Sequence, residues 1–251
     1  MAVTTTSPPS SLPNRMMNIQ YTDGMVPEKK VAWTSKWAAR DIFYALFILF
    51  IHVLCLFAPS TFSWGAAGVA YVLYLLTGMF GVHLSYHRNL AHKSFKLPKF
   101  LEYLFAYFAL HACQGDPMFW VSTHRYHHKY TDTERDPHSP VTGGLLFAHI
   151  GWLFDYNKMA SKGANYNNVH DLANQPYYRF LQKTMVLHSY LLTTLLYLIG
   201  GFPYVVWGML EILVVGFSDY VLNPAPKKAR SLGEMGHLHK PIFLAEIHLV
   251  T

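Results

Sequence analysis

The chain contains 251 residues, of which 52% are apolar and only 14% are Lys, Arg, Asp or Glu, against about 25% charged residues in a typical soluble domain. A soluble globular protein of this length needs more charged residues on its surface. The composition therefore excludes a secreted module and a mainly disordered chain. The net charge of +6 would favour a nucleic-acid binder only if the basic side chains shared one surface. With only two cysteines, Cys55 and Cys113, a disulfide framework and a cysteine-ligated zinc site are excluded as well.

The chain begins with a polar tail at residues 1–27. This tail is rich in Ser and Thr between Thr4 and Ser11, has no acidic residue before Asp23, and contains no apolar run that could form a signal-peptide core. We expect a disordered tail, with a short organelle-targeting segment as the alternative.

The first long apolar region runs from Ile42 to His87 without a single Lys, Arg, Asp or Glu. A membrane-spanning helix needs about 20 apolar residues, so this length predicts two spans, at about 42–58 and 66–86. The Pro and Gly residues at 59–65 break the helix between them. The sequence therefore predicts a first transmembrane hairpin.

A second charge-poor region, residues 184–210, is interrupted by Gly-Gly-Phe-Pro at 200–203. It predicts a third helix at 185–199 and a fourth that begins at Tyr204. These two helices form the second predicted hairpin.

Basic residues indicate the orientation of both hairpins. Neither predicted turn contains Lys or Arg, and all 20 basic residues lie before the first helix, in the 88–183 segment or after the fourth helix. The positive-inside rule then places both termini and the 88–183 segment in the cytoplasm. The sequence thus predicts an all-α integral membrane protein with four spans and a cytoplasmic helical cap. Membrane orientation accounts for the positive charge, so we expect no nucleic-acid partner.

The 88–183 segment forms the predicted cap. Its apolar stretch at 100–110 is too short to span a bilayer and predicts an interfacial or buried helix. Residues 132–140, with two prolines, predict a turn-rich loop.

Three histidines of this cap have the spacing of metal ligands. On a helix, His124, His127 and His128 lie on adjacent turns within about 100° of one face. Neutral imidazoles arranged in this way can converge on a metal ion. The alternative is a solvated basic stretch, because Arg125 and Lys129 flank these histidines.

A second histidine pair, His87 and His92, has a less regular spacing. Residues five apart are turned by about 140° on a straight α-helix, so both rings would meet only at a bent helix end or at two different ions. His83 and His87, which are four apart, have the tidier spacing, and the spacing alone leaves the choice between His83 and His92 open.

Two stretches around these histidines resemble the membrane fatty-acid desaturases, in particular the plant acyl-lipid and acyl-CoA Δ9-type group. The first histidine box reads Ser-Tyr-His-Arg-Asn-Leu-Ala-His at 85–92, and the second reads Trp-Val-Ser-Thr-His-Arg-Tyr-His-His at 120–128, followed by Asp-Pro-His-Ser-Pro at 136–140. The resemblance covers about residues 28–210, and the two boxes together with the loop are far more specific than either box alone.

The resemblance implies a four-helix membrane enzyme whose cytoplasmic cap holds two iron ions and uses O2 to desaturate a fatty acyl chain. It implies that Trp120 and Gln114 line the acyl tunnel, whereas Gly115 leaves open whether the acyl carrier is CoA or a glycerolipid. The expected electron donor is cytochrome b5 in the endoplasmic reticulum membrane, or ferredoxin if the membrane is that of a plastid. By position, the implied iron ligands are His87, His92, His124, His127 and His128.

The resemblance ends near residue 210. The family has a third histidine box and a further Asn and His after the fourth helix, and residues 211–251 contain no matching pattern. Glu211 and Asp219 also fall inside the fourth predicted helix, where a charge near the membrane centre costs about 2.5–3.5 kcal/mol. We therefore expect an incomplete desaturase domain at 28–210 and a divergent tail at 211–251, through truncation, splicing or a faulty gene model. An incomplete ligand set would hold iron weakly and impair activity.

Two other functions fit the same residues. A histidine-box lipid hydroxylase would begin from the same hydrogen abstraction and yield an alcohol. A catalytically inactive, metal-binding membrane protein could instead associate with a full-length desaturase.

Overall fold

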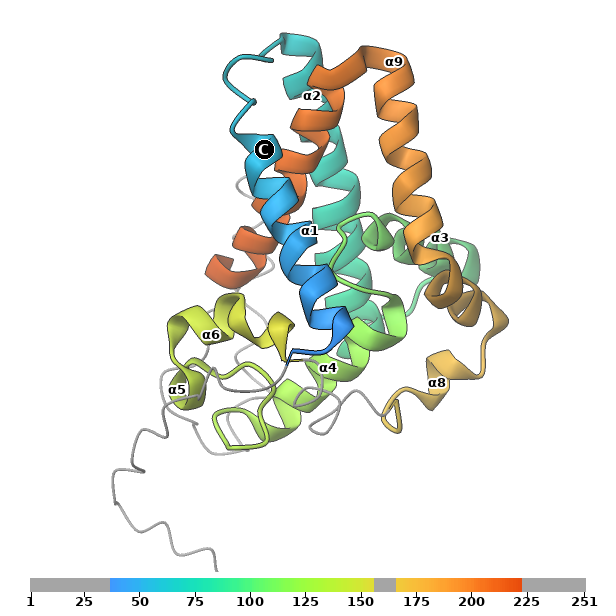
Figure 1. Ribbon diagram of the computed structural model, residues 1–251. Coiled ribbons are helices and arrows are strands. Elements are labelled where there is room, and N and C mark those ends of the chain that lie inside the picture. Colours follow the sequence, from blue (N-terminus) through green and yellow to red (C-terminus); the bar gives the residue numbers. More distant parts are fainter. Residues whose placement is uncertain (1–36, 156–165, 223–251) are drawn as a thin grey trace, which may run out of the picture.

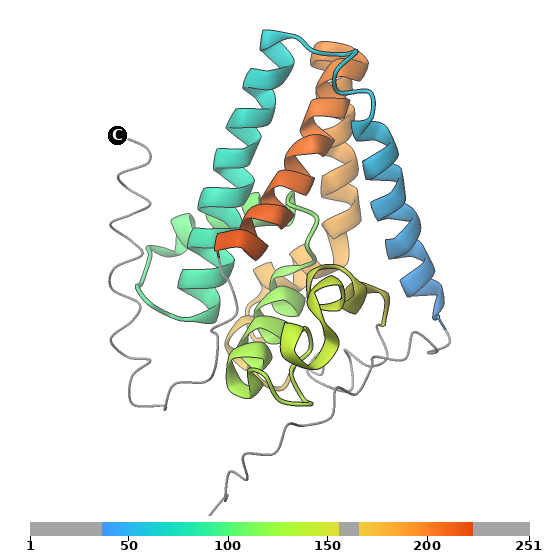
Figure 2. The same cartoon turned by 90° about the vertical axis from the view of Figure 1, so that its left-hand side faces the viewer.

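The computed structural model of the protein describes residues 37–155 and 166–222, and every regular element in these stretches is helical. Long helices run side by side and rest on a smaller group of short helices, the cap (Figures 1 and 2). The tail at 1–27 and most of the 211–251 segment lie outside the described residues, so the domain boundaries remain predictions.

The first hairpin consists of α1 (Ala39–Cys55), α2 (Trp64–Leu73) and η1 (Tyr74–Ala91). Ser63 begins α2, since its hydroxyl accepts a hydrogen bond from the Ala66 N–H at 3.1 Å, which satisfies one of the free donors at a helix start. The second helix continues without a break into η1, whose winding is that of a π-helix. The helices predicted at 42–58 and 66–86 correspond to these elements, and the second is longer than predicted.

The second hairpin is formed by the two arms of α9 (Pro176–Leu222). Its break lies at Gly201, whose φ of 64° is the left-handed conformation that glycine adopts without steric cost, and Pro203 follows without an N–H to donate. The second arm returns along α1 and α2 (Figure 1). The predicted break at 200–203 is therefore present, and the first arm begins earlier than predicted.

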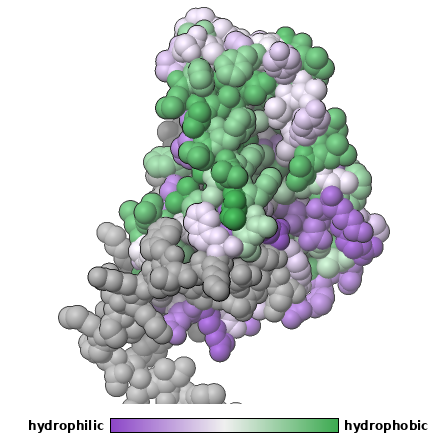
Figure 3. All heavy atoms as spheres, viewed as in Figure 1, coloured by the Kyte–Doolittle hydropathy of each residue, from purple (hydrophilic) through white to green (hydrophobic). Residues whose placement is uncertain are grey.

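Two helical stretches, 64–91 and 176–217, are long and apolar enough to cross a membrane. On the face shown in Figure 3, apolar residues prevail on the long helices, whereas hydrophilic residues gather on the visible part of the cap. Large apolar side chains stay exposed on these helices, among them Phe43, Leu46, Leu49 and Phe50 of α1 and Leu187, Leu191, Leu195 and Leu198 of α9.

Glu211 lies in the second arm of α9 and is buried. The Thr77 hydroxyl of η1 donates a hydrogen bond to its carboxyl group, so this buried polar group has a partner inside the helix bundle. The side chain of Asp219 lies outside the described residues.

The cap follows η1 and supplies about half of the buried apolar residues of the described part of the chain. Helix α3 coincides with the apolar stretch predicted at 100–110 and packs against η1, and α4 carries the second histidine box. Residues 132–139 form the predicted loop. The cap elements are α3 (Lys99–Leu110), α4 (Pro117–Tyr130), α5 (Pro140–Gly143), α6 (Leu145–His149), η2 (Gly151–Phe154) and α8 (His170–Ala173).

Gly81 sets how closely η1 approaches α3. A Cβ at this position would lie 2.5 Å from the backbone nitrogen of Ala109 and 2.6 Å from its Cα, and these backbone atoms are fixed in a helix. We expect Gly81→Ala to destabilise the protein by about 2–3 kcal/mol, within the range for overpacked cores, which thermal unfolding in detergent micelles would detect. Gly68→Ala on α2 is the matched control, because nothing lies within 4 Å of its added Cβ. Equal shifts in both variants would contradict the close approach.

Candidate metal centre

Four of the histidines predicted as ligands meet in one cluster, which we call the four-histidine cluster. It consists of His87 and His92 from the end of η1 and His124 and His128 from α4. One ring nitrogen of each residue lies within 4.8 Å of those of the other three. His83 is buried on η1 and is not a member of this cluster.

His124 is the centre of this cluster. Its Nε2 lies 3.1 Å from Nε2 of His92 and 3.0 Å from Nε2 of His128, and its ring centroid is 4.6 Å from that of His87. Two nitrogens bound about 2.1 Å from one ion and at right angles would be about 3.0 Å apart. The spacing therefore fits imidazole ligands of a first-row transition metal such as iron.

The winding of η1 explains how His87 and His92 reach the same cluster. The backbone N–H of His92 donates to the carbonyl of His87 at 3.0 Å, the i→i+5 hydrogen bond of a π-helix. This wider turn brings residues five apart onto nearly the same side, and their ring centroids lie 4.7 Å apart. From the sequence, the rings of His87 and His92 were expected to meet at a bent helix end or to bind two different ions. In the structure the helix end is π-helical.

The central imidazole of the cluster, that of His124, is available as a ligand. Burial lowers the pKa of His124 well below its ordinary value, and the neighbouring histidines, His87 first among them, lower it further. His124 is therefore neutral at neutral pH, the form in which imidazole binds metal.

His127 lies apart from the four-histidine cluster. It belongs to a second group with Asp136 and His138, which we call the His127 triad. Nδ1 of His127 is 2.8 Å from Oδ1 of Asp136, and its ring stacks on His138 with centroids 4.3 Å apart. Burial and the charge of His127 lower the pKa of His138 to about 4. Burial would raise the pKa of Asp136, but the hydrogen bond and charge of His127 outweigh it and lower that pKa.

Trp120 and Gln114 lie beside the four-histidine cluster. The indole of Trp120 stacks on His124 with ring centroids 4.8 Å apart, and its Nε1–H donates to Oε1 of Gln114 at 2.9 Å. These two residues, expected to line an acyl tunnel, therefore form one hydrogen-bonded pair against a cluster imidazole.

Arg125 ties the two histidine boxes together, a role that the spacing of histidines did not reveal. Its guanidinium donates to the carbonyl of Leu90, within the first box, at 2.7 Å, and to the carbonyl of Asn168 at 2.5 Å. It also binds both carboxylate oxygens of Asp171 at 2.9 Å each. Burial would raise the pKa of Asp171, but hydrogen bonds from Arg125 and Lys93 lower it to about 2.

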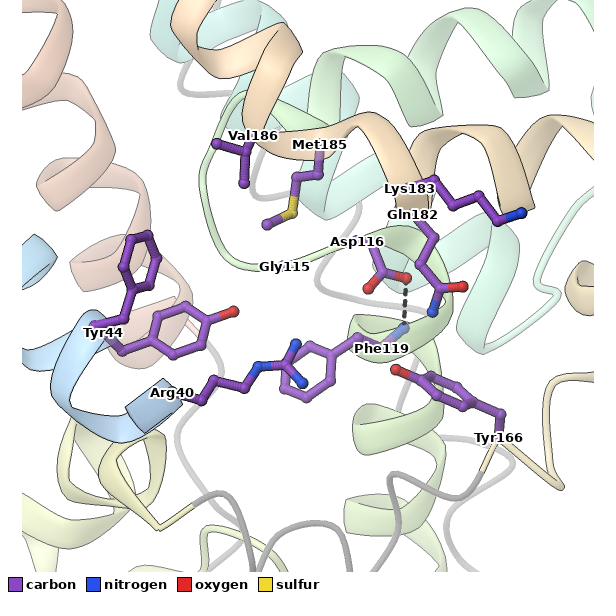
Figure 4. Close-up of a pocket in the computed structure, with 11 residues that line it drawn as sticks. Arg40, Tyr44, Gly115, Asp116, Phe119, Tyr166, Gln182, Lys183, Met185 and Val186 are labelled. Carbon is purple, nitrogen blue, oxygen red and sulfur yellow. Dashed lines mark hydrogen bonds between the residues drawn. The ribbon is translucent and has the colours of Figure 1, made fainter. Parts of the chain in front are cut away.

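A cavity of about 340 Å³ lies between α1, the start of α4 and the first arm of α9 (Figure 4). The guanidinium of Arg40 extends toward the other lining residues, whereas the ammonium group of Lys183 points away from them (Figure 4), and Phe43, Met185 and Val186 contribute apolar surface. Asp116 lines the cavity and accepts hydrogen bonds from the backbone N–H groups of Met118 and Phe119 at 3.0 and 3.1 Å, which caps α4. Burial raises the pKa of Asp116 above its ordinary value. The hydrogen bonds from Phe119 and Met118 and the charge of Arg40 lower this pKa, but by less than burial raises it. The cavity thus combines cationic and apolar walls at the junction of the cap and the long helices.

Comparison with known proteins agrees with this arrangement. Residues 62–226 match the model of the family described as fatty acid desaturase. The chain is 59% identical over 189 residues to an acyl-CoA C20 Delta5-desaturase of Anemone leveillei (75% of this chain, 60% of the relative). It is 51% identical over 182 residues to Delta-9 acyl-lipid desaturase 1 of Arabidopsis thaliana (72% and 59%), and 50% identical over 199 residues to the chloroplastic palmitoyl-monogalactosyldiacylglycerol delta-7 desaturase of the same plant (79% and 53%).

The chain therefore belongs to the fatty acid desaturase family. Members of this family are membrane-associated and generally contain two irons, and the two histidine groups of this chain could bind metal. The chain spans about three fifths of the length of two curated relatives that it matches, both of them acyl-CoA desaturases of Anemone leveillei.

Proposed function

We propose that this chain carries out, or forms the larger part of a protein that carries out, O2-dependent desaturation of a fatty acyl chain. The observation that carries the proposal is the convergence of His87, His92, His124 and His128 at the junction of a helical cap and long apolar helices. Two bound irons would supply the oxidising power that removes two hydrogens from an unactivated chain. Imidazole ligands suit such chemistry because, unlike thiolates, they are not readily oxidised.

The chain's own residues would position both irons and substrate. The four-histidine cluster would hold one ion, and His127 would contribute to the second. Trp120, fixed by its hydrogen bond to Gln114, would form a wall of the acyl site next to His124. A rigid apolar wall of this kind selects the reacting carbon by its distance from the metals.

The cavity at Arg40 and Lys183 is the proposed site for the polar end of the substrate. The Arg40 guanidinium beside apolar walls suits an anionic or strongly polar carrier attached to an acyl chain. The relatives include enzymes named for acyl-CoA and for acyl-lipid substrates, so acyl-CoA and acyl-glycerolipid are both proposed carriers.

We propose four membrane spans with both termini in the cytoplasm, formed by α1, by α2 with η1 and by the two arms of α9. Support comes from the exposed apolar side chains on these helices and from the absence of Lys and Arg between 56 and 63 and between 200 and 203. The proposed location is the endoplasmic reticulum membrane with cytochrome b5 as electron donor; a plastid membrane with ferredoxin is the alternative. The proposed desaturase domain is 28–210, flanked by a tail at 1–27 and a divergent segment at 211–251.

Expression in a yeast strain that lacks its own desaturase would test the function. One arm carries residues 1–251, and a second carries this chain joined to the C-terminal third of Delta-9 acyl-lipid desaturase 1. We expect the joined protein to produce a new double bond, detected by gas chromatography and mass spectrometry of the fatty acids, and its His124→Ala form to produce none.

Other results of this yeast experiment would identify the alternative functions. A hydroxylated fatty acid would show a lipid hydroxylase. Iron loading without any product, together with co-purification of a full-length desaturase, would show a metal-binding partner. Product from residues 1–251 alone would show that this chain carries the complete activity.

A further inference from the structure

Asp136 is a fully buried carboxylate in the loop that follows α4, with its side chain 0% exposed. Its Oδ1 lies 2.8 Å from Nδ1 of His127 and accepts the backbone N–H of His138 at 3.1 Å. Its Oδ2 accepts the backbone N–H of Asp132 at 3.0 Å. Both oxygens are thus held in place by the backbone of their own loop, and one of them faces His127.

This contact decides where His127 carries its proton. An ionised carboxylate can only accept hydrogen bonds, so Nδ1 of His127 has to donate to Asp136. In the neutral ring, Nε2 is then the unprotonated nitrogen, and it lies on the side of the ring away from Asp136. The geometry leaves that nitrogen with a lone pair for a metal ion.

The ring of His127 is also held by stacking. It packs on His138 with centroids 4.3 Å apart at 21°, and His138 packs in turn on Trp152 at 5.1 Å. Only 13% of the His127 side chain is exposed. Rotation of the ring would break both the stack and the hydrogen bond to Asp136.

We propose that Asp136 is a positioning residue that fixes the tautomer and the orientation of His127, so that Nε2 is presented to the second metal. The inference rests on the proposed function, because it takes His127 as an iron ligand. Metal-binding histidines commonly donate their other N–H to a carboxylate, and loss of that partner typically lowers metal affinity 10–100-fold.

Direct binding of a metal by the His127 triad is the competing arrangement. Oδ1 of Asp136 already receives two hydrogen bonds and Oδ2 a third. A metal bound between His127 and Asp136 would have to replace the hydrogen bond that joins them. The existing contacts therefore favour orientation by Asp136 over ligation by Asp136.

The first test measures the tautomer of His127 in the unaltered, metal-free protein. Histidine labelled with 15N in the ring and studied in micelles by NMR distinguishes the two tautomers, and His127→Ala assigns the signal. We expect the proton on Nδ1. A proton on Nε2 would overturn the proposal, and the tautomer itself is measured in the unaltered protein.

The second test compares Asp136→Asn with Glu134→Gln, an exposed acid-to-amide control in the same loop. The asparagine amide can donate to His127, so we expect a shift toward the Nε2–H tautomer and a fall of about 10–100-fold in Co2+ affinity at the second site. Glu134→Gln should change neither. An unchanged tautomer and affinity in Asp136→Asn would overturn the proposal.

A third measurement separates orientation from direct ligation. A metal bound between Asp136 and Nδ1 of His127 would replace the hydrogen bond that joins them, so adding Zn2+ to the labelled protein would remove the Nδ1–H signal of His127. Orientation by Asp136 predicts that this signal persists in the metal-bound protein, and its loss would overturn the positioning role. The tautomer and the Co2+ affinity are measured without substrate. A protein that produces no double bond would therefore refute the desaturase function without affecting the test of Asp136 as a positioning residue.

Discussion

Replacing His124 with alanine is expected to abolish metal binding by the four-histidine cluster. His124 contacts both His92 and His128 through Nε2, at 3.1 and 3.0 Å, so its removal takes the central donor from the site. His87, His92 and His128 remain close to one another, but the one nitrogen that contacts two of these rings is lost. We expect Co2+ or Fe2+ affinity to fall more than about 100-fold. This loss exceeds the one typical for removal of a residue that only hydrogen-bonds to a metal ligand. Metal titration followed by visible absorption, with iron content by mass spectrometry, measures the change.

His52→Ala is the matched control for this experiment. His52 lies on α1, is exposed, and its Nδ1 contacts the carbonyl of Ile48 at 2.8 Å. We expect this variant to bind metal as the unaltered protein does and to lose little stability. Iron retained at full stoichiometry after His124→Ala would refute the assignment of His124 as a ligand.

Replacing Arg125 with lysine is expected to loosen the arrangement of the two histidine boxes. A lysine ammonium cannot make the two parallel hydrogen bonds to Asp171 and still reach the carbonyl of Leu90. Hydrogen bonds that involve a charged group contribute about 1.5–3 kcal/mol each, so we expect the free energy of unfolding to fall by about 2–3 kcal/mol. Metal affinity should fall about 10-fold, because His92 follows the segment that Arg125 holds.

Lys129→Met provides the comparison for Arg125, because Lys129 is an exposed cation on the same helix. This variant should keep both stability and metal affinity.

The pH dependence of stability gives a separate check. Asp171 has a pKa lowered to about 2, below the value of about 3.9 expected in an unfolded chain, so its stabilising contribution is complete above pH 4 and is lost as the pH falls through 2. In Arg125→Lys this contribution should shrink and disappear at a higher pH.

Hydropathy and spacing predicted the elements that depend on local sequence. The uncharged run from Ile42 to His87 predicted the first hairpin, and Gly-Gly-Phe-Pro at 200–203 predicted the break in α9. The regular spacing of His124 and His128 predicted that both lie on one face of a helix. In each case a feature within one or two helical turns determines the structure.

Contacts between distant segments were not predictable in this way. Arg125 makes its hydrogen bonds to Leu90, Asn168 and Asp171, which lie more than 30 positions away in the sequence. His127 has helical spacing to His124, yet its nearest partner is Asp136, which comes from the following loop. The spacing of histidines shows which residues share a helix, whereas the tertiary fold decides which partner each ring meets.

The π-helical winding at the end of η1 makes the number of residues between His87 and His92 a geometric requirement. Deleting one residue between them would turn the second ring back by the rotation of one residue and shift it along the helix axis, unless the segment rewound as an ordinary α-helix. Adding one residue would rotate the ring away in the opposite sense. In this chain, the length of the first histidine box and the pitch of its helix are therefore matched to each other, and a change in one calls for a compensating change in the other.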